Sequence, residues 1–225
     1  ASAQQHGKRI LDYLDEHYYP QANGVFSNNT DAATNALRLR STRALWDPTY
    51  TDESWIADKV NLIPRMKGWV ANNYPGTKLA ISEYSWGAPG HINGALAQAD
   101  VLGIFGREGV DLATLWSPPN ANDPVAFAFR MYLNIDGKGG RFRAYAVRAT
   151  SADQGKLAVY ASRRGKKGAM TLIAVNKSGT PLSSKITLSH FAAGTKAKVY
   201  RYSPANLSAI QHLANTPVRD RKSVV

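Results

Sequence analysis

The chain has 225 residues, enough to bury one large core or two smaller ones, and it contains no cysteine, which excludes disulfides and thiolate metal sites. Its net charge of +12 is unevenly divided: residues 1–137 hold 11 Lys/Arg and 14 Asp/Glu, a net of −3, whereas residues 138–225 hold 17 and 2, a net of +15. No run of 18 apolar residues occurs, so no segment is predicted to span a membrane.

Residues 1–137 alternate between helix and strand patterns, and three successive strand–helix units predict a parallel sheet with helical crossovers. Strands are expected over residues 11–18, 79–83 and 111–116. Helical patterns are expected over residues 2–8, from the capping residue Asp31 to about 45, from about 55 through Pro64 to 70, over 93–107, and from Pro124 to 133.

Residues 138–219 change character and predict an antiparallel β-sandwich. Their β-rich runs, over residues 156–160, 170–175, 185–188 and 197–202, are separated by turns that contain glycine. The run Asp136-Gly137-Lys138-Gly139-Gly140 is a strong turn signal at the point where the charge changes sign, and it predicts a domain boundary between residues 137 and 138. The fold class is therefore α/β plus all-β.

The most informative stretch is Lys78-Leu79-Ala80-Ile81-Ser82-Glu83-Tyr84-Ser85-Trp86-Gly87. A short apolar run, typical of a strand buried on both faces, ends in a single carboxylate, Glu83, flanked by aromatic residues. (β/α)₈ glycosidases present a nucleophilic carboxylate at the carboxyl end of a strand in this way. The alternative from this stretch alone is a glutamate that caps the following helix.

Segments on both sides of Glu83 distinguish the two interpretations, because the sequence resembles glycoside hydrolase family 44, a family of endo-acting β-glucanases and xyloglucanases. Five segments carry the resemblance in the family's order and spacing: LDYLDEHYYP (11–20), LWDPTY (45–50), LIPRM (62–66), ISEYSWG (81–87) and NGALAQADVL (93–102). The resemblance covers most of residues 10–215. It implies that Glu83 is the nucleophile of a retaining enzyme and that a β-sandwich packs beside a (β/α)₈ TIM barrel.

The resemblance also implies that the chain is the C-terminal portion of a longer enzyme. In the family, the strand ending in His-Tyr-Tyr is the sixth of the barrel, the Glu strand is the seventh and the Trp strand is the eighth. Eight units need roughly 250 residues, so we expect the first five strands and the proton-donating glutamate to be missing. The chain opens at Ala1 with neither methionine nor a leader pattern, and we expect neither a native start nor a signal peptide there.

Residues near Glu83 are candidates to bind the substrate or to orient the nucleophile. His17 and Tyr18 end the neighbouring strand and can donate hydrogen bonds to Glu83, although His17 can equally be a structural histidine. Tyr84 either orients Glu83 or packs in the core. Nothing marks Asp15, on the same strand as His17, as the proton donor.

Tryptophans are candidate sugar platforms, because the apolar face of a glucose ring stacks on an indole, but large buried tryptophans are also ordinary core residues. The candidates are Trp46, Trp55, Trp86 and Trp116. Trp116 has the strongest case because it ends the third strand on the expected catalytic side. No paired histidine spacing indicates a metal, and no cofactor is expected; structural calcium is compatible with the resemblance, without assignable ligands.

The predicted function is a fragment of a secreted, monomeric endo-β-1,4-glucanase that acts on polysaccharide and binds neither nucleic acid nor membrane. The alternative is a non-catalytic module that binds carbohydrate or polyanions through basic residues such as Arg163-Arg164-Gly165-Lys166-Lys167. Residues 220–225 are expected to be a non-native tail, since GATCGGAAGAGCGTCGTG encodes them and resembles a sequencing adapter; the alternative is an ordinary basic tail.

Overall fold

The structure is a computed structural model that describes residues 7–165 and 168–218. Its elements in chain order are β1 (Tyr13–Tyr18), α2 (Ala32–Ser41), the 3₁₀ turn η1 (Thr42–Leu45), α3 (Leu62–Asn73), β2 (Lys78–Tyr84), α4 (Ile92–Glu108), β3 (Leu112–Leu115), α5 (Pro124–Leu133), β4 (Tyr145–Val147), β5 (Leu157–Arg163), β6 (Met170–Asn176), β7 (Lys196–Ser203) and β8 (Asn206–Pro217).

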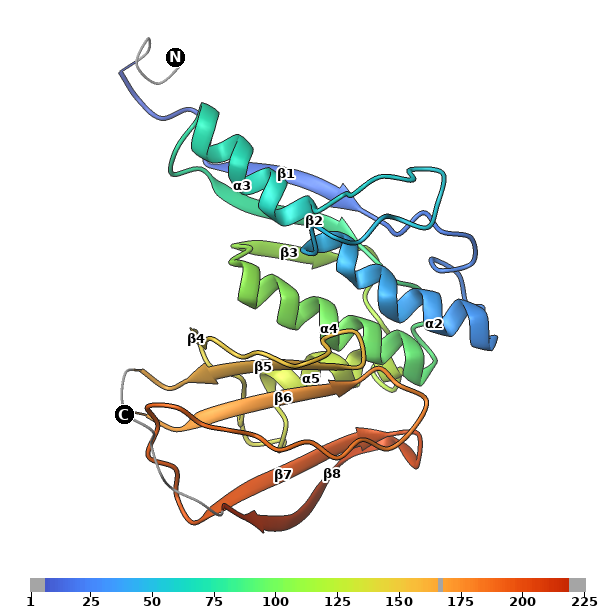
Figure 1. Ribbon diagram of the computed structural model, residues 1–225, viewed down its shortest axis with the longest axis vertical. Helices are drawn as coiled ribbons and strands as arrows, with labels where there is room; N and C mark the ends of the chain where they lie inside the picture. The colour runs from blue at the N-terminus through green and yellow to red at the C-terminus, as the bar shows by residue number, and fades with distance from the viewer. Residues whose placement is uncertain (1–6, 166–167, 219–225) are drawn as a thin grey trace.

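The predicted parallel sheet is confirmed. Strands β1, β2 and β3 pair in parallel in that order, with Leu14 opposite Leu79 and Ala80 opposite Leu112. Because the three strands run the same way, their carboxyl ends meet at one edge of the sheet. Figure 1 shows α4 between this sheet and the antiparallel strands β5 and β6.

Local capping explains where two helices begin. Asp31 is the N-cap of α2, as predicted, and its side chain accepts a hydrogen bond from the backbone N–H of Thr34. Hydrogen bonds from the Thr34 hydroxyl and from this backbone N–H lower the pKa of Asp31. Helix α4 begins one residue earlier than expected because His91 supplies the cap, and it ends at Gly109 in the left-handed conformation that glycine adopts without strain.

The helical pattern predicted before Pro64 is wrong over residues 55–60. Here the Asp52 side chain accepts a hydrogen bond from the backbone N–H of Ser54, and Ala57 has a positive φ of 46°. A short side chain that binds the backbone two residues later favours a turn over a helix. Helix α3 therefore begins only at Leu62.

The C-terminal strands form two antiparallel groups, one with the order β4-β5-β6 and one made of β7 and β8. Sequence analysis missed β4 and β8. The predicted strand over residues 185–188 is wrong: this run pairs with no strand within the described chain, and Ile186 remains exposed. An alternating pattern predicts a strand only where a partner is available to accept its backbone hydrogen bonds.

The turn signal at residues 136–140 corresponds to a real turn. Asp136 accepts hydrogen bonds from the backbone N–H groups of Lys138 and Gly140, and these bonds lower its pKa. Even so, the hydrophobic core continues beyond this turn, because Tyr160 on β5 and Ile173 on β6 belong to the same buried cluster as Ile81 on β2. The antiparallel sheet therefore packs directly on the helical layer.

Helix α4 is the centre of that packing. Gly103 has no side chain, and a Cβ there would lie 2.2 Å from the ring of Tyr160. The close approach brings the Tyr160 hydroxyl to Asp100, at 2.6 Å. Lys177, just after β6, reaches the same carboxylate at 2.8 Å, so a buried ion pair joins the two halves of the chain.

Two predictions fall wholly or largely outside the described residues: the helix over residues 2–8, of which only residues 7 and 8 are described and form a bend, and the tail over residues 220–225. Among the residues that are described, none of the helices is long and apolar enough to cross a membrane.

Candidate active site

Glu83 lies at the carboxyl end of the middle strand of the parallel sheet, one residue before β2 ends. Ile81, two residues earlier, is completely buried, whereas 28% of the Glu83 side chain is exposed. His17 on β1 is its partner in the parallel register. The strand thus anchors Glu83 in the core and presents its carboxylate at the open edge.

Two side chains from the end of β1 contact the same carboxylate oxygen. The Tyr19 hydroxyl donates to Oε2 of Glu83 at 3.1 Å, and Nδ1 of His17 lies 3.2 Å from that oxygen. Partial burial and the neighbouring Glu83 raise the pKa of Tyr19 to about 12, so this hydroxyl keeps its hydrogen at neutral pH. Oε1 accepts no hydrogen bond within the described part of the chain, which leaves it free to attack an electrophile.

A second carboxylate, Asp15, is linked to this pair through Ser82. The backbone N–H of Ser82 donates to Oδ1 of Asp15 at 2.9 Å, and the Ser82 hydroxyl donates to Oδ2. The same hydroxyl oxygen lies 3.3 Å from Nε2 of His17. Desolvation opposes ionisation of Asp15, but the hydrogen bonds from Ser82 outweigh it and lower the pKa of that carboxyl.

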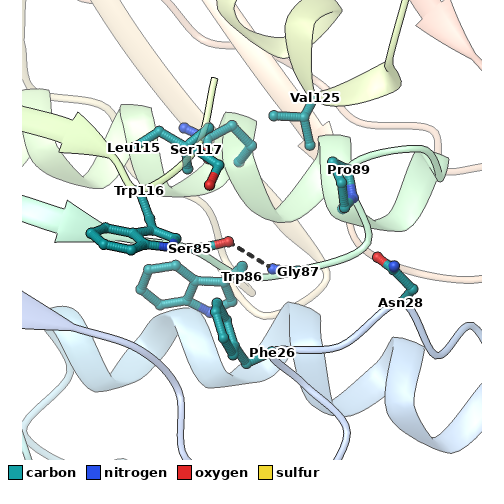
Figure 2. A pocket seen from close by; sticks show the side chains of 12 residues that line it. Phe26, Asn28, Ser85, Trp86, Gly87, Pro89, Leu115, Trp116, Ser117 and Val125 are labelled. Carbon is teal, nitrogen blue, oxygen red and sulfur yellow. Dashed lines mark hydrogen bonds between the residues drawn. The ribbon is translucent and has the colours of Figure 1, made fainter. Parts of the chain in front are cut away.

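A cavity of about 190 Å³ opens beside these residues, where β2 and β3 end. Figure 2 shows the rings of Phe26, Trp86 and Trp116 gathered at this cavity. Phe26 also packs edge-on against Tyr19, with ring centroids 4.8 Å apart, so the cavity adjoins the donors of Glu83. Phe26 is 48% exposed and Trp116 is 57% exposed, which leaves aromatic surface available to a ligand.

Arg38, a fully buried residue of α2, holds the loops that carry this aromatic surface. Its Nε donates to the backbone oxygens of Val25 at 3.1 Å and Trp86 at 2.8 Å. Its other nitrogens donate to oxygens of Gly24, Ser27, Asn29, Asn35 and Asn93. A planar, always charged guanidinium can satisfy several carbonyls at once. Arg38 thereby fixes the loop after β1 against the loop after β2.

Comparison with known proteins adds to this geometry. No family model matches the sequence. Endoglucanase A of Paenibacillus lautus is 35% identical over an alignment of 229 positions, which covers 97% of this chain and 33% of that protein. The crystal structure of CelM2, a bifunctional glucanase-xylanase from a metagenome library, matches with a TM-score of 0.91 and 45% identity over 98% of this chain and 42% of CelM2.

A xyloglucanase from glycoside hydrolase family 44 of Paenibacillus polymyxa matches with a TM-score of 0.85 and 33% identity, covering 98% of this chain and 45% of that one. Nearly the whole of this chain is thus similar to part of a glycoside hydrolase family 44 enzyme. The solved structures of the family combine a TIM barrel with a β-sandwich, and this chain spans less than half the length of each relative named here.

Three predicted site residues lie in the core of this chain instead of at Glu83. Tyr18 is buried and packs on Trp86, with ring centroids 5.6 Å apart. The Trp86 indole, itself almost fully buried, donates to the Ser41 hydroxyl. Tyr84 accepts a hydrogen bond from Gln98, and burial raises its pKa to about 12. These side chains therefore form part of the core beneath the carboxyl ends of the strands. Trp86 also lines the cavity.

The remaining tryptophans differ from one another. Trp46 stacks under the guanidinium of Arg107, at 4.2 Å, near the end of α4. Because α4 begins after the carboxyl end of β2 and runs back to the start of β3, this is the opposite end of the sheet from Glu83. Trp55 is 80% exposed in the irregular segment before α3. Of these three tryptophans, only Trp116 both follows a strand end and lines the cavity.

Sequence analysis missed Tyr19 and Phe26. A signal for Tyr19 was present, because side chains alternate along a strand and residues two apart share a face. Since His17 points to Glu83, Tyr19 was the better candidate than Tyr18. Phe26 carried no comparable signal, because its position depends on contacts of Arg38 with distant residues. Over residues 7–165 and 168–218, no three His, Asp or Glu side chains cluster closely enough to hold a metal ion.

Proposed function

We propose that this chain is the C-terminal part of a retaining endo-β-1,4-glucanase that acts on cellulose, xyloglucan or a related polysaccharide, with Glu83 as the nucleophile. The observation that carries the proposal is the placement of Glu83: a partly exposed carboxylate at the carboxyl end of a parallel strand, with two neighbours on one oxygen and the other oxygen free. The relatives named as endoglucanase, glucanase-xylanase and xyloglucanase support the substrate class.

In a retaining mechanism, one carboxylate attacks the anomeric carbon while a carboxylic acid about 5–5.5 Å away protonates the leaving oxygen. Glu83 forms the covalent bond to the sugar, and the glycosidic C–O bond breaks as the leaving oxygen takes the proton. Water later hydrolyses this glycosyl-enzyme with the second carboxyl acting as base. Tyr19 and His17 fix the direction of Glu83 through Oε2 and leave Oε1 to react.

The proton donor lies outside this chain in our proposal. Asp15 is a carboxyl linked to Glu83 through Ser82 and His17, but its lowered pKa keeps it ionised, which is the wrong state for a general acid. The three parallel strands are then the last three of an eight-stranded barrel, in residues 1–137, and residues 138–219 belong to the β-sandwich. The parent enzyme is extracellular and monomeric in this proposal, with no resident cofactor.

The test is a chimera in which this chain replaces the corresponding segment of CelM2, its 45% identical relative. Glu83→Gln should reduce hydrolysis of carboxymethyl cellulose by at least about 1,000-fold, equivalent to about 4 kcal/mol of barrier. Azide should partly restore activity to Glu83→Ala by replacing the lost nucleophile. If Glu83→Gln keeps more than roughly a tenth of the activity, Glu83 is not the nucleophile.

The unmodified chain provides a second measurement. Without a proton donor it should not hydrolyse glucans at a normal rate. Tyr13 and Leu112, which belong to the outer strands β1 and β3, are both exposed. Unpaired strand edges of this kind promote association, so the chain should aggregate in size-exclusion chromatography. A soluble monomer that cleaves carboxymethyl cellulose would show that the acid is present in these residues.

A further inference from the structure

The hydrogens between Asp15 and Glu83 can be assigned from the contacts alone. Ser82 has a single hydroxyl hydrogen, and that hydrogen is donated to Oδ2 of Asp15. An ionised Asp15 carboxylate cannot donate in return, because it carries no hydrogen. The Ser82 oxygen can therefore interact favourably with Nε2 of His17 only as an acceptor, so Nε2 carries a hydrogen.

The other nitrogen of His17 is constrained in the same way. Nδ1 lies 3.2 Å from Oε2 of Glu83, which as a carboxylate oxygen is also only an acceptor. A bare Nδ1 at this distance would set a lone pair against a negative oxygen. Both ring nitrogens therefore face acceptors, and both contacts are satisfied when the imidazole carries two hydrogens and a positive charge.

We propose that Asp15 and Ser82 are positioning residues that hold His17 as a doubly protonated donor and so fix the Glu83 carboxylate. The proposal rests on the proposed function for its catalytic meaning, and it adds residues outside direct contact with the nucleophile. The chain of contacts runs from Asp15 on β1 through Ser82 on β2 to His17, and from His17 back to Glu83.

The arrangement suits a nucleophile that must stay ionised and keep one orientation. A doubly protonated imidazole gives Glu83 a charge-assisted hydrogen bond, and contacts at both ring nitrogens stop the imidazole from turning. The titratable groups that face the imidazole from the described elements are Asp15 on β1, Glu83 on β2 and Tyr19 just after β1. Tyr19 donates to the same Oε2, so the two donors together leave Oε1 for the sugar.

The first test uses the CelM2 chimera labelled with ¹⁵N-histidine, because the chain alone is expected to aggregate. Long-range ¹H–¹⁵N NMR distinguishes ring nitrogens with and without hydrogen, and His17→Gln identifies the His17 signals among those of the other histidines. At neutral pH we expect hydrogen on both nitrogens of His17. Asp15→Asn should remove the Nε2 hydrogen, because an amide at residue 15 donates to Ser82 and turns the serine hydroxyl towards Nε2.

A matched control and a double variant make the test specific. Glu16→Gln removes one negative charge from the adjacent residue of β1, whose side chain lies on the other face of the strand, and it should leave the His17 signals unchanged. In a Ser82→Ala background, Asp15→Asn should have no further effect, because the link is already broken. A bare Nε2 in the unsubstituted chimera overturns the proposal, whether or not any variant folds.

The second test uses the CelM2 chimera. Asp15→Asn should lower kcat about tenfold, as for an outer hydrogen-bond partner, with KM unchanged. Glu16→Gln should change neither. Equal effects of the two substitutions would overturn the positioning role. The NMR result needs no substrate, so it stands or falls separately from the assignment of Glu83 as nucleophile.

Discussion

Glu83 on β2 and Asp100 on α4 are both carboxylates held by side-chain donors, but the two regions around them differ in access. Asp100 is 1% exposed, and both of its oxygens are used by three donors from distant parts of the chain: Thr42, Tyr160 and Lys177. Glu83 is partly exposed, and both of its contacts meet at a single oxygen.

The difference shows that hydrogen bonding alone does not identify a reactive carboxylate. Both oxygens of Asp100 accept hydrogen bonds, one of them from a buried ammonium, and the side chain is almost fully buried. Neither oxygen is therefore left for a ligand. Burial and the Asp100 charge raise the pKa of Tyr160 well above its ordinary value, which keeps this donor protonated. Asp100 therefore stabilises the junction between α4 and the antiparallel sheet, whereas Glu83 keeps the unpaired oxygen that the proposed nucleophile needs.

The largest effect we expect on stability comes from breaking the buried pair. Lys177→Met leaves the Asp100 carboxylate buried without its cation, and loss of one partner of a buried pair typically costs about 3–5 kcal/mol. The free energy of unfolding of the CelM2 chimera, measured by urea denaturation followed by circular dichroism, should fall by this amount. Adding Asp100→Asn should recover part of the loss, because the uncompensated charge is removed.

Lys156→Met is the matched control for that experiment. Lys156 also pairs with a carboxylate, Asp153, at 3.5 Å, but both side chains are more than half exposed. Solvent-exposed pairs contribute roughly 0–1 kcal/mol, so this substitution should be nearly neutral. Similar losses from Lys156→Met and Lys177→Met would mean that the Asp100 junction contributes no more than a surface ion pair.

The same contrast explains what sequence reasoning could predict. The apolar run before Glu83 and the flanking turns indicate a buried strand, and the strand's end indicates where a carboxylate becomes accessible. These are local signals, and the parallel sheet follows from three of them in order. Asp100 gave no such signal, because Lys177 is 77 residues away and the contact exists only once β6 packs on α4.

The wrong predictions have equally specific causes. Residues 55–60 have apolar residues at helical spacing, but the Asp52 side chain favours a turn and Ala57 takes a positive φ. The strand pattern around Ile186 lacked a partner. Tyr18 was favoured over Tyr19 although the alternation of side chains along β1 puts Tyr19 with His17. Hydrophobic periodicity therefore predicted most helices and strands. It failed where a tertiary contact decided the structure, or where the face of the strand decided which side chain reaches the site.

An intermediate effect is expected from Arg38, which affects both stability and the loops beside the site. Arg38→Lys keeps a positive charge but cannot reproduce the planar set of donors, so several buried carbonyls lose their partner. We expect a loss of about 2–4 kcal/mol in unfolding free energy. In the CelM2 chimera, KM should rise as the loops carrying Phe26 and Trp86 lose their fixed position.

Arg40→Lys serves as the comparison for this substitution, because it lies on the same helix and makes an exposed pair with Glu53 at 2.6 Å. It should change stability by less than about 1 kcal/mol and leave KM unaltered. Should Arg38→Lys behave like Arg40→Lys in both measurements, the buried guanidinium does not organise the loops.

The smallest effect on stability, and the clearest separation of site from scaffold, is expected from Trp116. Trp116→Ala removes an exposed ring at the cavity, so the unfolding free energy should change by less than about 0.5 kcal/mol. Activity of the chimera on neutral glucans should fall roughly fivefold, since a lost stacking contact is worth about 1 kcal/mol. Trp69→Ala, which removes a partly exposed ring from α3, should leave activity unchanged.

Replacing the four basic residues of the turn with glutamine decides between the proposed glucanase and a polyanion-binding module. The residues are Arg163, Arg164, Lys166 and Lys167, of which the two lysines lie outside the described residues. Uncharged sugars gain little from distant cations, so the chimera's activity should be retained, and any binding of the chain to heparin should be weak and fall steeply with salt. If instead the basic turn is required and Trp116 is not, an acidic polymer is the ligand, and the +15 charge of residues 138–225 marks the functional surface.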